Sequence, residues 1–305
     1  MKILVTGASG FIGGEVVEHL ATNPDLTIIA TGRSFTSRFE GFSNVEYLQI
    51  DFTKQIPSLE CEVCIHCAGL ADDRASEEEF IKNNVLATER LIGSMKDCQK
   101  FIFISSSSVY DFSDGKPKKE EDAYLYEELS PYGKSKLIAE KIVAASGISS
   151  VFILRPRAVY GTNDRVLLPR IFRLLKGKTF VVPGDLKVIT SLTHISNLLE
   201  AVRKTIYDQR KGLLIYNIAD KETYILRSVF EKIGMLKTGR KVKFLTVPIA
   251  SVKTLIILKK KLGLKTSISI QSLNYLTQNS AIVSRKASKE LGLDVAFDFH
   301  KDFSL

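Results

Sequence analysis

The stretch that decides the fold is Lys2-Ile3-Leu4-Val5-Thr6-Gly7-Ala8-Ser9-Gly10-Phe11-Ile12-Gly13. It starts as a short, largely apolar run, passes through three glycines at every third position, and leads into residues 15–20, whose apolar positions have helical spacing. This order predicts a strand, a tight turn and a helix. Glycines let the backbone approach a pyrophosphate closely, and a helix N-terminus offers free N–H groups and partial positive charge. We therefore predict a dinucleotide site at this turn.

Strand and helix patterns continue to alternate along the chain. Further strands are predicted at residues 26–31, 45–49, 63–67, 101–105, 151–154 and 213–218, and further helices at 77–96 and 135–145. Such alternation indicates an α/β fold with a Rossmann doubly wound parallel sheet. We expect a dinucleotide-binding Rossmann domain at 1–157 with a returning strand near 213–219. Residues 158–185 and 220–305 are expected to form a smaller substrate-binding lobe over the carboxyl ends of the strands.

Charge is concentrated in the last third of the sequence. The chain has 305 residues and a formal net charge of +9, and residues 232–289 contain 13 Lys or Arg and no Asp or Glu. Such a field suits an anionic small molecule, an anionic membrane surface or nucleic acid, but no nucleic-acid-binding module is recognisable. We expect an anionic small-molecule substrate and no nucleic acid; a solvated basic face is the plainer alternative.

Targeting segments and metal sites are not expected. The first strand begins at Lys2, which leaves no room for a secretory signal, and the apolar stretch 247–258 is interrupted by Pro248 and Lys253. These features predict a cytoplasmic protein with no transmembrane segment. Cys61, Cys64 and Cys67 could suggest a metal site, but strand alternation should send Cys61 and Cys64 to opposite faces, so we predict reduced, packed thiols and no metal.

The end of the second predicted strand bears on cofactor choice. A site for NAD normally has an acidic residue there, whereas this sequence has Thr31-Gly32-Arg33-Ser34. Arginine pairs well with a 2′-phosphate and Ser34 adds a donor, so NADP is favoured, with NAD possible. Arg33 could instead lie along the adenine. Asp51 follows the third strand, where it could meet the adenine or cap a helix.

Tyr132 and Lys136 lie four residues apart at the start of a predicted helix, with Ser130 as its N-cap and Pro131 at its first position. The spacing places them on one face. A nearby ammonium group favours ionised tyrosine and should bring its pKa down from about 10 toward working pH. Tyr132 is therefore a candidate general acid or base. In isolation, the same pair would be an ordinary exposed helix pair.

Six stretches of the sequence, taken in the order in which they occur, form a specific pattern. They are Thr6-Gly7-Ala8-Ser9-Gly10-Phe11-Ile12-Gly13, Cys67-Ala68-Gly69, Ser105-Ser106-Ser107-Ser108-Val109-Tyr110, Tyr132-Gly133-Lys134-Ser135-Lys136, Leu154-Arg155-Pro156-Arg157-Ala158-Val159-Tyr160-Gly161 and Ser284-Arg285-Lys286-Ala287 with Glu290-Leu291-Gly292. Together they resemble the extended short-chain dehydrogenase/reductase family, also called the NAD-dependent epimerase/dehydratase family. The resemblance covers most of the chain.

The resemblance implies roles for individual residues. Ser106, Tyr132 and Lys136 are the expected catalytic set, with Ser107 as a near alternative to Ser106 that would otherwise contact substrate. Lys136 would also hold the nicotinamide ribose. The family implies a homodimer through the helices flanking Asn84 and Tyr132. The expected cofactor-binding residues are Gly7, Ser9, Gly10, Phe11, Ile12, Gly13, Arg33, Ser34, Asp51, Ala68, Gly69, Tyr132, Lys136 and Pro156.

The resemblance also implies hydride transfer at a secondary alcohol or ketone, most often of a nucleotide sugar, by a 4-keto reductase or a 4-epimerase. An arginine that commonly binds the diphosphate in such enzymes is replaced here by Thr190, so Arg170, Arg173 or Lys187 would have to substitute. The stretches 184–187 and 191–197 resemble the 3β-hydroxysteroid dehydrogenase branch as much, which keeps a hydrophobic alcohol open as substrate. A non-catalytic NADP-binding regulatory protein is the least favoured alternative, because Ser106, Tyr132 and Lys136 are all present.

Overall fold

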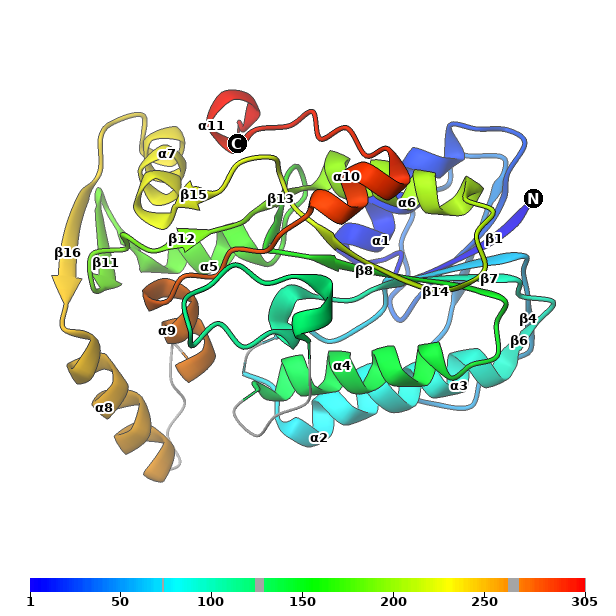
Figure 1. Ribbon diagram of the computed structural model, residues 1–305, viewed down its shortest axis with the longest axis horizontal. Coiled ribbons are helices and arrows are strands. Elements are labelled where there is room, and N and C mark those ends of the chain that lie inside the picture. Colours follow the sequence, from blue (N-terminus) through cyan, green and yellow to red (C-terminus); the bar gives the residue numbers. More distant parts are fainter. Residues whose placement is uncertain (73, 124–128, 263–268, 305) are drawn as a thin grey trace.

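The computed structural model describes residues 1–72, 74–123, 129–262 and 269–304, and a seven-stranded sheet runs through its centre (Figure 1). The strand order is β14-β8-β7-β5-β1-β2-β3, and every neighbouring pair is parallel. The strands are β1 (Lys2–Thr6), β2 (Thr27–Gly32), β3 (Val45–Gln49), β5 (Val63–His66), β7 (Lys100–Ile104), β8 (Ser150–Pro156) and β14 (Gly212–Ile218). The predicted Rossmann-type sheet is therefore confirmed.

Helices cover both faces of this sheet because both faces are apolar. On one face, α1 (Phe11–Ala21), α6 (Ile195–Tyr207) and α10 (Arg285–Leu291) share a core with β1 residues such as Ile3 and Val5. On the other face, α3 (Ala87–Ser94) and α4 (Pro131–Ala144) pack against Leu4 and Phe101. Alternate side chains of each buried strand thus enter two separate cores.

The predicted helix at 77–96 consists of three parts and ends two residues early. It contains α2 (Glu77–Phe80), a π-helical turn (Ile81–Leu86) and α3 (Ala87–Ser94), followed by the short strand β6 (Met95–Lys96), which pairs with β4 (Leu59–Glu60). The π turn carries Asn84, whose side chain bonds both the N–H and the C=O of Leu70. Apolar periodicity could not show this turn, because one extra residue per turn leaves the overall pattern helical.

Smaller sheets and a third core lie beyond the carboxyl ends of the main strands. They contain β9 (Val159–Tyr160) with β13 (Thr193–His194), β12 (Ile189–Thr190) with β15 (Tyr224–Ile225), and β10 (Leu175–Lys176), β11 (Thr179–Pro183) and β16 (Lys243–Val247). The helices there are α5 (Leu167–Leu174), α7 (Leu226–Thr238), α8 (Ile249–Lys261), α9 (Ile270–Thr277) and α11 (Phe299–Asp302), and 3₁₀ turns occur at Ser107–Val109 and Glu120–Asp122.

The third core is separate from the cores beside the main sheet and contains Phe180, Phe230 and Phe299. By contrast, α10 packs through Ala287 and Leu291 into the core that α1 and α6 form on one face of the main sheet. The returning strand expected near 213–219 is β14, and it lies at the edge of the main sheet. The division at 158–185 and 220–305 remains a prediction.

The cysteines are free, but the reasoning from strand alternation was wrong. β5 begins at Val63, so Cys61 lies outside it and turns back into the same core as Cys64. Burial raises the pKa of the Cys64 thiol. No group of three or more His, Cys, Asp or Glu side chains among the described residues is arranged to hold a metal ion. Within the same residues, no helix combines the length and apolar character needed to cross a membrane.

Candidate active site

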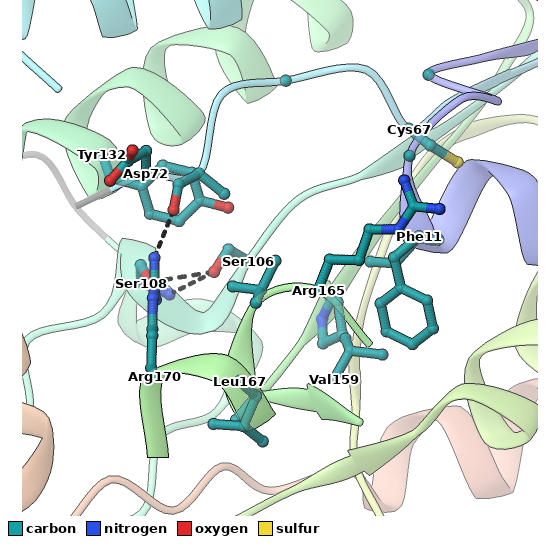
Figure 2. Close-up of a pocket in the computed structure, with 18 of the residues that line it drawn as sticks. Phe11, Cys67, Asp72, Ser106, Ser108, Tyr132, Val159, Arg165, Leu167 and Arg170 are labelled. Atoms are coloured by element: carbon teal, nitrogen blue, oxygen red, sulfur yellow. Dashed lines mark hydrogen bonds between the residues drawn. The ribbon is translucent and has the colours of Figure 1, made fainter. Parts of the chain in front are cut away.

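A cavity of about 700 Å³ lies at the carboxyl ends of the sheet strands, between the glycine turn and helices α5 and α9 (Figure 2). Segments far apart in the sequence meet there. From the sheet side the wall includes Gly7, Ser9, Gly10, Phe11, Ile12, Gly13, Arg33, Asp51, Ala68, Gly69, Ser106, Tyr132 and Pro156. Most of the residues predicted for cofactor binding and catalysis are thus brought together in one wall.

The glycine turn leaves no room for side chains. Gly7 has a φ of +72°, and a Cβ there would lie 2.7 Å from the Ala68 nitrogen; at Gly13 it would lie 2.4 Å from the Gly7 carbonyl oxygen. Helix α1 begins after Gly10 with no side-chain cap and no acidic residue in its first turn. Its first N–H groups and partial positive charge are therefore directed to an anion in the cavity, which fits a dinucleotide pyrophosphate.

The far end of the cavity carries the residues predicted to meet the adenosine. Arg33 lines the wall and donates to the Asn83 side chain at 3.1 Å. Asp51 also lines it, but its carboxylate already accepts from the backbone N–H and the hydroxyl of Thr53, which lowers its pKa. Ser34 is exposed and is not among the described residues of the wall. A cation is therefore available for a 2′-phosphate.

The serine segment after β7 presents two hydroxyls to the cavity. The Ser106 oxygen accepts from the Ser108 backbone N–H, and its hydroxyl donates to Ser108 Oγ, each at 3.1 Å. Ser107 is 1% exposed, and it is not one of the described residues that line the cavity. The geometry therefore favours Ser106 over its predicted alternative Ser107, and it adds Ser108.

Helix α4 begins at Pro131, directly after the predicted N-cap and four residues before the predicted helical range 135–145. Ser130 Oγ accepts from the Gly133 N–H at 3.0 Å, and Pro131 occupies the first turn, so both capping predictions are confirmed. Tyr132 faces the cavity and packs against Phe80, with ring centroids 5.7 Å apart. Lys136 is buried one turn later, and its Nζ donates to the Ile104 carbonyl at 2.8 Å.

The electrostatics of this pair differ from the expectation that Lys136 lowers the tyrosine pKa. Burial raises the pKa of Tyr132 to about 12, and a hydrogen bond with Ser106 only partly offsets it. Burial lowers the pKa of Lys136 to about 8, although the Glu140 carboxylate opposes the shift. Desolvation dominates for both groups, because Lys136 is buried and Tyr132 is partly buried in the cavity wall, where each charged form loses hydration.

A buried ion pair holds α4 against the sheet behind Tyr132 and Lys136. Arg155 on β8 contacts the Glu140 carboxylate at 2.6 Å, and both side chains are less than 5% exposed. Ser105 donates to the same carboxylate at 2.5 Å, and Arg155 also donates to the Tyr110 hydroxyl at 2.9 Å. Because Glu140 lies one turn after Lys136, this network sets the position of α4 relative to β7 and β8.

Tyr275 and Arg157 are wall residues that the sequence did not reveal. The Tyr275 hydroxyl, from α9, lies 2.7 Å from Ser108 Oγ. The Arg157 guanidinium lies over the Tyr275 ring, 4.6 Å from its centroid, and donates to Ser280 Oγ at 2.7 Å. No sequence motif marks Tyr275; its role becomes visible only because α9 packs against the serine segment.

The predicted substrate-binding cations do not share one location. Arg170 and Arg173, both on α5, line the cavity, and Arg170 points toward Tyr132 and Asp72 while donating to the Ala71 carbonyl at 2.6 Å (Figure 2). Lys187 has a 76% exposed side chain paired with Asp185, and it is not among the described wall residues. Arg165, which was not predicted, points toward the glycine turn (Figure 2).

Comparison with known proteins agrees with the motifs. A model of the NAD dependent epimerase/dehydratase family matches residues 3–219. The UDP-glucose 4-epimerase of Vibrio cholerae is 29% identical over 72% of this chain and 70% of that protein. The decarboxylating sterol-4-alpha-carboxylate 3-dehydrogenase of Dictyostelium discoideum is 28% identical over 95% of each.

Among solved structures, MoeE5 in complex with UDP-glucuronic acid and NAD is 25% identical, covers 99% of this chain and 96% of its own, and superposes with a TM-score of 0.75. The match of the family model to most of the chain, together with the glycine turn and the Ser, Tyr and Lys side chains in one cavity, leads to one conclusion. The chain belongs to the NAD dependent epimerase/dehydratase family and is an NAD(P)-dependent oxidoreductase.

Proposed function

We propose that the chain is an NADP-dependent reductase acting on the ketone of a nucleotide-activated sugar, with Ser106, Tyr132 and Lys136 as its catalytic set. The observation that carries the substrate class is the position of Arg170 and Arg173 on the wall that also holds Ser106 and Tyr132. Guanidinium groups suit the diphosphate of a sugar nucleotide. The UDP-glucose 4-epimerase of Vibrio cholerae, a relative over 72% of the chain, supports the same class.

The proposed chemistry is a balanced hydride and proton transfer. A reduced nicotinamide dinucleotide, held by the glycine turn and Arg33, would supply the hydride for the carbonyl carbon. The Ser106 hydroxyl donates a hydrogen bond to the carbonyl oxygen, and the Tyr132 phenol gives that oxygen its proton, so the ketone becomes a secondary alcohol. Solvent then reprotonates the Tyr132 phenolate, which the Lys136 ammonium stabilises while it lasts. Arg157 and Tyr275 hold the serine segment on the opposite side of the cavity.

The NADP preference is proposed from Arg33. Its side chain lies at the adenosine end of the wall, and no acidic residue occurs at residues 31–34 to accept from a ribose hydroxyl. Titration of the purified protein with NADPH and NADH tests this directly. Arg33→Ala should weaken NADPH binding by about tenfold or more, because a charge-assisted contact contributes about 1.5–3 kcal/mol, and it should leave NADH binding nearly unchanged.

Tight NAD binding that does not respond to Arg33→Ala would contradict the NADP proposal and favour an epimerase, which keeps its cofactor through both half-reactions. Absence of dinucleotide binding would contradict the whole proposal. Turnover with keto-sugar nucleotides tests the substrate class, and loss of that turnover in Arg170→Ala with intact NADPH binding would separate the two sites.

A second candidate is a hydrophobic alcohol or ketone. It is favoured by the apolar part of the same wall, which includes Leu167, Leu192, Leu226, Phe230 and Leu276. The sterol-4-alpha-carboxylate 3-dehydrogenase of Dictyostelium discoideum, related over 95% of the chain, supports it. Turnover with hydroxysteroids but not with keto-sugar nucleotides would select this alternative. The homodimer and the cytoplasmic location stay predictions.

A further inference from the structure

Helix α8 exposes large apolar side chains instead of burying them. Leu255 and Leu258 are each 52% exposed and Leu262, just after the helix, is 62% exposed. Their spacing of three and four residues places them along one side of the helix. Ile256 is the buried contact of this helix, at 7% exposure. A run of exposed leucines at one site indicates a surface that meets an apolar partner.

The surroundings of these leucines extend the same surface. Of the 17 large hydrophobic residues that are exposed in the described part of the chain, eight lie within residues 235–262. They occur at the end of α7, on β16, and along α8. In Figure 1 these elements form one end of the molecule, and α8 projects beyond the body there. The exposed apolar side chains are therefore concentrated at one end.

The sequence around α8 carries only positive charge. Residues 232–289 contain 13 Lys or Arg and no Asp or Glu. On α8 itself, Lys253 and Lys261 are exposed, and neither forms an ion pair with any residue that the structure describes. At about 100° per residue, Lys261 lies about 90° from the middle of the leucine row, whereas Lys253 lies on the opposite side of the helix. The exposed surface of α8 therefore combines an apolar row with cationic positions outside that row.

We propose that α8 docks the protein onto an anionic lipid bilayer, with Leu255, Leu258 and Leu262 entering the interface and Lys253 and Lys261 at the headgroups. Leucines exposed at a membrane surface can bury apolar area in the interface while lysines are attracted to anionic headgroups, and the two contributions add. An anionic bilayer therefore suits both the positive charge around α8 and its exposed leucines. This proposal does not depend on which substrate the enzyme reduces.

Two other partners fit less well. A second copy of the chain meeting α8 through a two-fold axis would set this cationic surface against itself, with no acidic residue in 232–289 to compensate. Nucleic acid would satisfy the lysines but would leave the exposed leucines without an apolar environment. Helix α8 also packs against α9, which supplies Tyr275 and Leu276 to the cavity wall, so docking would bring the cavity to the lipid surface.

The test is flotation of the full chain with phosphatidylcholine vesicles that contain or lack phosphatidylglycerol. The protein should float with anionic vesicles only, and salt should weaken the binding. Lys253→Glu with Lys261→Glu should lower the partition coefficient at least about twentyfold, because each lysine near the surface contributes about fivefold. Leu255→Ser with Leu258→Ser should lower it at least about tenfold.

Matched controls lie elsewhere on the surface. Leu213→Ser with Ile225→Ser removes apolar side chains that are 49% and 53% exposed, and Lys211→Glu with Lys221→Glu reverses two exposed lysines. Both should bind vesicles as the parent does, and NADPH affinity should be the same in all variants, which shows that each is folded. Equal loss in the controls, or no preference for anionic vesicles, would overturn the proposal. So would light scattering in which the leucine variant dissociates a dimer that does not bind lipid.

Discussion

The hydroxyl oxygens of Tyr275 and Ser108 lie 2.7 Å apart, although 167 positions separate them in the chain. Ser108 in turn bonds Ser106, which bonds the phenol of Tyr132. The charge interaction between the two phenols is one of the causes that raise the pKa of Tyr132. A residue of α9 is therefore linked, through two serines, to the proposed general acid.

Tyr275→Phe removes the hydroxyl at the end of this link. We expect kcat/KM to fall about fivefold to tenfold, because one hydrogen bond contributes about 1 kcal/mol and the Ser108 hydroxyl keeps only its bond with Ser106. The loss of a group that raises the pKa of Tyr132 should also move the tyrosine-dependent limb of the pH profile to lower pH. Tyr207→Phe, at an exposed tyrosine on α6, is the control and should change neither quantity.

Lys136→Met should change how stability depends on pH. The folded-state pKa of Lys136 is lowered from 10.5 to about 8, so the unfolded chain binds this proton more tightly and the group favours folding increasingly as pH rises from 8 to 10.5. Between pH 7 and 9.5, the parent should gain about 2 kcal/mol in unfolding free energy relative to Lys136→Met.

Urea unfolding of both proteins at the two pH values measures this gain. Taking the difference between them removes the titration of the buried thiols, which is common to both. A difference that stays constant with pH would contradict the lowered pKa. Activity should be lost in the variant at all pH values.

Arg155→Met should destabilise the fold by about 3–5 kcal/mol, because it leaves the Glu140 carboxylate buried without its cation. Replacing both residues, with Glu140→Leu added, should restore part of the loss. Chemical denaturation gives the values. Lys2→Ala serves as the contrast, since its ion pair with Glu60 is exposed and its removal should cost less than about 1 kcal/mol. Equal effects at the two pairs would refute this account.

Gly13→Ala should abolish dinucleotide binding and destabilise the chain, because the new Cβ would lie 2.4 Å from the Gly7 carbonyl oxygen. Gly93→Ala is the matched substitution in α3, where a Cβ meets nothing within 4 Å. That change should stabilise the protein by about 0.5–1 kcal/mol, because alanine is the better helix former. NADPH titration and thermal unfolding of both variants test the pair; tight NADPH binding by Gly13→Ala would contradict it.

The sequence by itself determined the elements whose signals are local. The run ending at Gly7, the N-cap at Ser130 and the other apolar strand runs depend on turn chemistry and on residue types within a few positions, and all were found within one or two positions. Arg33 was likewise expected at the cofactor site from its position at the end of the second strand, and it lines the cavity. Local rules succeed there because local backbone geometry sets which residues fit.

Only the tertiary structure decided the features that depend on packing between distant segments. It turned Cys61 into the same core as Cys64, left Lys187 on the surface, and brought Tyr275 to Ser108. It also reversed the expected pKa shift of Tyr132, because burial raises this pKa by more than Ser106 and Arg170 lower it. The physical reason is common to all four: solvent exclusion and contact across the fold depend on where whole elements pack, and no short stretch of sequence contains that information.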